Sequence, residues 1–143
     1  MNYILDTNVI SELVVPEPKA EVITWIDSID PESVFLSVIT IGELKKGIEK
    51  LPSSKRKKDL STWLHEDLLV RFHDRILSLD ILVLLSWGVL IADLEKKGKP
   101  LPAIDSLLAA TAAETGFTLA TRNVAHFKPS GISVINPWAG APE

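Results

Sequence analysis

The sequence predicts an α/β fold with a mainly parallel central sheet flanked by helices. Short apolar runs alternate along the chain with longer segments in which apolar residues recur every three or four positions. Parallel strands need long crossover connections, and these helical segments supply them. No linker, repeat or low-complexity stretch divides the 143 residues, so we expect one domain spanning 1–143.

The first half of the chain is expected to form two strands, each followed by two helices. Pro16 and Pro18 stop the first helix, and the pair Asp30-Pro31 turns the chain into the second strand. The expected elements are a strand at 3–5, a helix over about 9–14, a helix over 19–28, a strand at 33–37, a helix over 40–51 and a long helix over 52–72.

The second half repeats the alternation. The expected elements are a short strand within 75–80, a helix over about 82–97 ended by Gly98, a helix from Pro102 to Gly116, a strand at 118–120 and a last strand within 131–137. The most apolar stretch, "ILVLLSWGVLIA" at 81–92, is about half as long as a bilayer crossing requires. We therefore expect a buried helix here and no membrane association. Trp63 and Trp87 fall on apolar faces, which indicates core or interface positions.

Composition favours a cytoplasmic globular protein that buries some surface against a partner. The chain has 46% hydrophobic residues, a mean hydropathy of +0.21 and a net charge of −4. An acidic chain is not expected to bind nucleic acid over its whole surface, although a local basic patch remains open. The lack of cysteine excludes disulfides and cysteine-ligated metals. Asp6 and Asn8 interrupt the first apolar run, so no signal peptide is expected.

Three carboxylates occupy the positions where open α/β sheets build their sites. Asp6 ends the first strand, Glu43 is expected in the first turn of the helix after the second strand, and Asp105 in the first turn of the helix that starts at Pro102. These acids are far apart in the sequence, so only the fold can bring them together. An all-oxygen set of this kind suits Mg²⁺ or Mn²⁺.

Each acid also has an ordinary structural explanation. Glu43 and Thr40 match a capping box, Asp105 beside Pro102 would complement the helix dipole, and Asp6 would bond amides of the next helix. Three carboxylates that converge without a cation, however, repel one another and raise each other's pKa. If the fold gathers them, a metal site is the better interpretation.

Four segments and a terminal "INPW" occur in a characteristic order. The segments are "ILDTNVISEL", "ITIGELKKGI", "PLPAIDSLLAATA" and "LATRNVAHF". Together they resemble the PIN domain, and more narrowly the bacterial toxin ribonucleases of the VapC and FitB type. Each motif alone is weak, but the ordered set is specific and spans nearly the whole chain. The resemblance implies a PIN-like α/β/α sandwich.

The resemblance also implies which residues form the site. Asp6, Glu43 and Asp105 match the three acids with which the family binds Mg²⁺ or Mn²⁺ and hydrolyses RNA. Many members carry a fourth acid near "TRN", where this chain has Asn123 and His126. Asn123 offers a carbonyl oxygen as a weaker ligand. His126 is expected at the surface, because such a site prefers oxygen.

Further polar residues are expected around these acids. Asn8, Glu12 and Thr121 resemble residues that line the family's pocket. There they would orient metal ligands or water, with helix capping and solvent exposure as the alternative roles.

Basic residues are expected to meet the RNA. Lys45 and Lys46 begin a basic run over 45–58, just after Glu43, that would contact phosphates flanking the site. The alternative is a solvated helix face and loop. Arg122 would also reach a phosphate.

These observations predict an endoribonuclease that hydrolyses phosphodiester bonds with metal-activated water, leaving a 5′-phosphate and a 3′-hydroxyl. No general base for attack by the ribose 2′-hydroxyl can be identified. The resemblance further implies the toxin of a type II toxin–antitoxin system, a cognate antitoxin that silences it, and a homodimer.

Two other functional classes fit parts of the sequence. "ILDTN" is similar to the aspartyl-phosphate strand of haloacid-dehalogenase-type phosphohydrolases, but Asn8 stands where that family has a second Asp. A non-catalytic binding or dimerisation module would use its acids only as helix caps. A dinucleotide-binding Rossmann domain is disfavoured, because no G-x-G-x-x-G follows the first strand.

Overall fold

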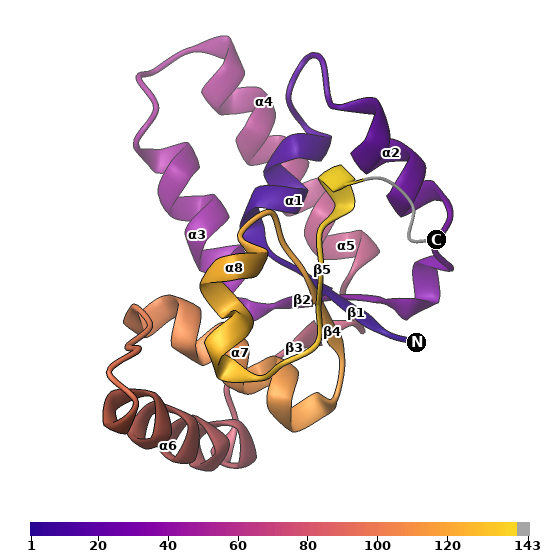
Figure 1. Cartoon of the computed structure of the whole chain (residues 1–143). Helices are drawn as coiled ribbons and strands as arrows, with labels where there is room; N and C mark the ends of the chain where they lie inside the picture. Colours follow the sequence, from indigo (N-terminus) through magenta and orange to yellow (C-terminus); the bar gives the residue numbers. More distant parts are fainter. Residues whose placement is uncertain (140–143) are drawn as a thin grey trace.

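A five-stranded, all-parallel sheet forms the centre of the computed structural model, which describes residues 1–139 (Figure 1). Its strand order is β3-β2-β1-β4-β5, and every neighbouring pair is parallel. The strands are β1 (Tyr3–Leu5), β2 (Val34–Ser37), β3 (Ile76–Leu77), β4 (Thr118–Ala120) and β5 (Val134–Ile135). The predicted parallel sheet is therefore confirmed.

Helices connect successive strands, as parallel pairing requires. They are α1 (Thr7–Leu13), α2 (Ala20–Asp27), α3 (Val38–Glu49), α4 (Lys55–Trp63), α5 (Leu69–Arg71), α6 (Ile81–Lys96), α7 (Ala103–Thr115) and α8 (Val124–Phe127). A π-helical segment, Leu64–Leu68, joins α4 to α5, and short 3₁₀ turns lie at Pro31–Ser33, Lys128–Ser130 and Pro137–Ala139.

Two hydrophobic cores cover the two faces of the sheet. Alternate strand residues point to opposite faces, so Leu5 packs with α1, α2, α3 and the segment that follows α4, whereas its neighbour Ile4 packs with α7 and α8. Leu36 belongs to the first core and Leu119 to the second. This arrangement is the α/β/α sandwich expected from the sequence.

The topology brings three loop regions to one edge of the sheet. β1 is the central strand and pairs in parallel with β2 on one side and β4 on the other. The carboxyl ends of these strands therefore lie together, and α1 and α3 begin there. Asp6 caps α1, and the Ser37 side chain caps α3 by accepting a hydrogen bond from the amide of Ile39 at 3.1 Å.

Several helix boundaries differ from the expected ones, and side-chain N-caps explain where α1 and α4 begin. α1 begins at Thr7 rather than near Val9, because Asp6 already caps it. The long helix expected over 52–72 starts only at Lys55, after its cap Ser54, and is interrupted by the π-helical turn. Pro102 precedes α7 instead of lying in its first turn, whereas Gly116 ends that helix with a φ of 75°, as expected.

The segment expected to be a buried helix, 81–92, is instead an exposed one. It forms most of α6, which packs against α7 and lies at one end of the molecule (Figure 1). Only Val83 and Leu94 of α6 are buried, while Leu85 is 64% and Val89 is 74% exposed. Apolar composition alone did not reveal that one face of this helix has no partner within residues 1–139. None of the helices in these residues is long and apolar enough to cross a membrane.

Candidate active site

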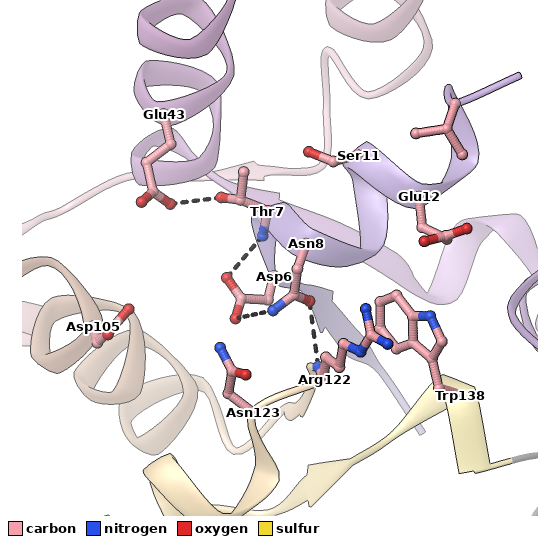
Figure 2. A pocket seen from close by; sticks show the side chains of 11 residues that line it. Asp6, Thr7, Asn8, Ser11, Glu12, Glu43, Asp105, Arg122, Asn123 and Trp138 are labelled. Carbon is pink, nitrogen blue, oxygen red and sulfur yellow. Dashed lines mark hydrogen bonds between the residues drawn. The ribbon is translucent and has the colours of Figure 1, made fainter. Parts of the chain in front are cut away.

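One cavity of about 460 Å³ lies at the edge of the sheet where the three acids were expected (Figure 2). Asp6, Glu43 and Asp105 all line it, although they come from the end of β1, from α3 and from α7. The other lining residues are Thr7, Asn8, Ser11, Glu12, Val15, Arg122, Asn123 and Trp138. The fold thus gathers the predicted acids in one pocket.

Asp6 is held at the centre of this group by hydrogen bonds to both carboxylate oxygens. The amide of Thr7 donates to Oδ1 at 2.7 Å, and the hydroxyl of Thr121 donates to Oδ2 at 2.8 Å. The side-chain amide of Asn8 adds a longer bond to Oδ2 at 3.4 Å. Asp6 therefore caps α1, which is the structural role expected for it from the sequence, and it also faces the cavity.

The electrostatic environment of Asp6 is unfavourable to its charge. Burial raises its pKa above the usual value of 3.8, and only 6% of the residue is exposed. The hydrogen bonds from Thr121 and Thr7 lower the pKa, but the negative charges of Asp105 and Glu43 raise it further. A cation in the cavity would remove both the repulsion and part of the desolvation penalty.

Glu43 has a different position and partner from those expected. Because α3 starts at Val38, Glu43 lies in its second turn, and Thr40 is a buried residue inside the helix. The capping-box explanation is therefore wrong. Glu43 Oε1 instead accepts a 2.5 Å hydrogen bond from the hydroxyl of Thr7, which links α3 to the start of α1 (Figure 2).

Asp105 lies in the first turn of α7, as expected, and contacts a second titratable side chain. His126 Nε2 lies 2.9 Å from Asp105 Oδ2. Because a carboxylate carries no proton, the imidazole nitrogen is the donor when Asp105 is ionised. His126 is partly exposed, with 40% of its side chain accessible, but its contact with Asp105 was not foreseen.

Asn8, Thr121 and Asn123 form a hydrogen-bonded support behind Asp6. Thr121 is fully buried, and its hydroxyl oxygen accepts a hydrogen bond from the backbone amide of Asn123 at 3.1 Å. The Asn8 side chain reaches this hydroxyl and the backbone of Arg122, whose amide donates to Asn8 Oδ1 at 3.3 Å. Asn123 itself faces the cavity. These contacts fit the orienting role expected for Asn8 and Thr121.

The remaining expected residues divide into two groups. Glu12 lines the cavity and also accepts a hydrogen bond from the amide of Lys19 at 2.9 Å. Neither Lys45 nor Lys46 lines it. Lys45 forms an ion pair with Glu49 one helical turn further along α3, at 3.2 Å. The structure thus brings Glu12 to the site but not the two lysines.

The residues from 3 to 128 match the model of the PIN domain. The chain belongs to the PIN-domain family. Plasmid stability protein StbB of Pseudomonas syringae pv. tomato is 42% identical over 94% of this chain and 97% of its own length. Toxin FitB of Neisseria gonorrhoeae is 38% identical over 94% of this chain and 97% of its own length. VapC ribonuclease Y4jK of Sinorhizobium fredii is 38% identical over 96% of this chain and 99% of its own length.

Solved structures show the same relationship. FitAB bound to a DNA fragment superposes with a TM-score of 0.91 at 36% identity, covering 99% of this chain and 97% of that chain. FitAcB from Neisseria gonorrhoeae gives a TM-score of 0.91 at 38% identity, covering 95% and 98%. Membership of the PIN family weighs against the haloacid-dehalogenase alternative.

The donor set of this PIN domain suits a hard divalent cation. Three carboxylates and the side-chain amide oxygen of Asn123 supply oxygen only, the chemistry that Mg²⁺ and Mn²⁺ prefer. Among residues 1–139, no three His, Asp or Glu side chains lie close enough to hold an ion directly. An ion that keeps several water ligands, as Mg²⁺ does, fits such a wide pocket.

Four lining residues were not predicted as parts of the site, namely Thr7, Ser11, Val15 and Trp138. The contact of Thr7 with Glu43 depends on how α1 packs against α3, which local sequence patterns do not specify. Ser11 follows Thr7 by one helical turn, so helical spacing would have found it once Thr7 was known. Trp138 lies in the terminal "INPW", and nothing in that motif alone indicates a position beside the acids.

Proposed function

We propose that this PIN domain is a metal-dependent endoribonuclease and the toxin of a type II toxin–antitoxin system. The observation that carries the proposal is the convergence of Asp6, Glu43 and Asp105 in one cavity. Support comes from relatives named VapC ribonuclease and toxin FitB, each 38% identical over nearly the whole chain. The proposed reaction is hydrolysis of an RNA phosphodiester bond.

Mg²⁺ or Mn²⁺ is the proposed cofactor. Asp6, Asp105 and Glu43 would hold it, at least one of them through a water ligand of the ion, and the side-chain amide oxygen of Asn123 would be a weaker ligand. When bound, such an ion neutralises phosphate charge and lowers the pKa of a water molecule. The protein's own contribution is orientation: Thr121 and the Thr7 amide fix the carboxylate of Asp6, while the Thr7 hydroxyl fixes that of Glu43.

A cognate antitoxin is the first proposed protein partner. The likeness to toxin FitB and to the FitAB structure supports it. An antitoxin arginine placed among the acids would neutralise them and occupy the position of the cation. The protein is proposed to meet both RNA and antitoxin in the cytoplasm.

A second copy of this chain is the other proposed partner. The exposed face of α6 carries Ile81, Leu85 and Val89 at four-residue intervals and no charged side chain between 81 and 92. Contiguous apolar surface of this kind is typical of interfaces, and the same face on two copies can pair about a two-fold axis.

Cleavage of RNA by the purified protein tests the proposed activity. Total RNA would be incubated with wild type in Mn²⁺, Mg²⁺ or EDTA, and with Asp105→Asn in the metal buffers. We expect cleavage with a metal, none in EDTA, and about a 100-fold lower rate for Asp105→Asn. Asp93→Asn is the matched control, since Asp93 pairs with Lys97 on α6 and does not line the cavity. RNA that stays intact under all conditions, or equal cleavage in EDTA, would contradict the proposal.

A further inference from the structure

Arg122 and Trp138 lie against each other on one side of the cavity. The guanidinium carbon of Arg122 is 5.1 Å from the centroid of the Trp138 ring, within the range of a cation–π contact. Both residues line the same cavity as the three acids. Figure 2 shows the Arg122 side chain extending from the end of β4 onto the indole, on the side of the cavity away from Asp105 in this view.

The backbone and the ring both restrict Arg122. Its amide donates to Asn8 Oδ1 at 3.3 Å, and the preceding residue, Thr121, is fully buried. Trp138 is half-buried and packs at the edge of the first hydrophobic core, so the face it presents is fixed. The cation–π contact with that face restrains the guanidinium group and leaves its N–H groups available to a ligand.

Arg122 also stands out by its charge. Asp6, Glu12, Glu43 and Asp105 give the cavity four acidic side chains, and Arg122 is the one Lys or Arg among its lining residues within 1–139. In that part of the chain its side chain forms no ion pair with any of these acids. A cation that is restrained but not neutralised inside an acidic pocket is suited to an anionic ligand.

RNA presents such an anion at every nucleotide. A divalent ion held by the acids would offset the charge of the phosphate that is cleaved, but the next phosphate along the strand would still be repelled by the acidic pocket. Arginine binds phosphate through two parallel N–H bonds, and a pre-oriented guanidinium loses less freedom on binding.

We propose that Arg122, held over Trp138, forms a subsite for the phosphate next to the scissile bond of single-stranded RNA. This inference rests on the proposed ribonuclease function, which it extends from the reaction to the binding of the substrate. Arg122 contacts the substrate directly, and Trp138 is a positioning residue that acts through Arg122.

Steady-state cleavage of a single-stranded RNA oligonucleotide at several salt concentrations tests the subsite. For Arg122→Gln we expect KM to rise about tenfold with kcat within about twofold of wild type. The slope of log KM against log salt should fall by about 0.7, the value for one phosphate contact on a single strand. Lys128→Gln is the matched control: it removes the same charge from an exposed residue outside the cavity and should change neither value.

Conservative variants separate the subsite from a structural role. Arg122→Lys should give an intermediate KM, because lysine keeps the charge but lacks the two-pronged geometry. Trp138→Phe should stay near wild type, whereas Trp138→Leu should raise KM about threefold while keeping the salt slope, because the cation remains but is no longer held. An unchanged KM and salt slope in Arg122→Gln would overturn the subsite.

Failure of the subsite and failure of the ribonuclease proposal give different results. If wild type does not cleave RNA, binding of fluorescently labelled single-stranded RNA to the Asp105→Asn chain, with and without Arg122→Gln, still decides the subsite by anisotropy. Weaker binding in the double variant supports it, and equal binding overturns it. If Arg122→Gln weakens only the complex with the antitoxin, Arg122 binds an acidic peptide and the RNA subsite is rejected.

Discussion

The acidic cavity and the outer face of α6 depart in opposite ways from the rule that folded proteins bury apolar side chains and expose charged ones. Asp6 is a carboxylate that is only 6% exposed beside two other acids, whereas Val89 is an apolar side chain that is 74% exposed. The isolated chain compensates neither of them fully. Each departure therefore supports one of the proposed additions to the chain: a cation in the cavity and a second copy of the chain on α6.

The largest effect is expected for the carboxylate of Asp6 in the cavity. Asp6→Asn removes one charge from the most buried acid, and we expect RNA cleavage to fall about 1,000-fold because the ion loses a ligand and its hold on the phosphate. Mn²⁺ binding, followed by the electron paramagnetic resonance signal of the free ion, should weaken in parallel. Cleavage within a few-fold of wild type would show that Asp6 is only a helix cap.

The sequence predicted the cavity better than it predicted the face of α6. The sheet and the positions of Asp6 and Asp105 follow from local sequence patterns, because neighbouring residues determine where strands end and where helices start. The contact between Thr7 and Glu43 depends on the packing of two helices, which no local pattern specifies. The exposure of α6 could not be read from its sequence at all, because a helix packed in a core and one packed on a partner have the same apolar composition.

A substitution on the outer face of α6 tests whether that face binds a second copy of the chain. Val89→Glu places a charge on the exposed face of α6, and we expect the dissociation constant of the dimer to rise about 100-fold because the charge would be buried without a partner. Sedimentation velocity over a range of concentrations measures this shift.

Val70→Glu is its matched control. Val70 follows the π-helical segment in α5 and is 62% exposed, so the same substitution occurs at a similar exposure but outside the proposed interface. We expect Val70→Glu to leave the dissociation constant of the dimer unchanged. Equal behaviour of the two variants would mean that the outer face of α6 does not bind a second copy.

A smaller effect is expected inside the cavity from Thr7→Val. This nearly isosteric change removes the hydroxyl that donates to Glu43 at 2.5 Å but keeps the backbone amide that donates to Asp6. We expect kcat to fall about tenfold, because Glu43 loses the group that orients it. Ser11→Ala is the control, since Ser11 lines the same cavity and its side chain forms no hydrogen bond with an acid among residues 1–139. A similar loss in both variants would indicate a general effect of pocket polarity.

The smallest expected effect concerns stability and depends on pH. Because the pKa of Asp6 is raised in the folded chain, its ionisation opposes folding. The protonated Asp6 carboxyl contributes to the stability of the folded chain. This contribution is fully present at a pH below the usual pKa of 3.8 and is lost as the pH rises through the raised pKa of the folded chain. Asn at this position cannot ionise, and the hydrogen bond that Asn fails to reproduce costs the same at every pH.

The difference in melting temperature between Asp6→Asn and wild type therefore isolates this charge. In EDTA we expect that difference to move by a few degrees in favour of Asn as pH rises from below 3.8 to neutrality, because only wild type acquires a buried charge. Added Mn²⁺ should reverse the trend at neutral pH, since the ion stabilises only the chain that keeps the carboxylate. If the difference in melting temperature does not change with pH, burial and the neighbouring acids do not destabilise the ionised form of Asp6. The cavity would then have no uncompensated charge to match the uncovered apolar face of α6.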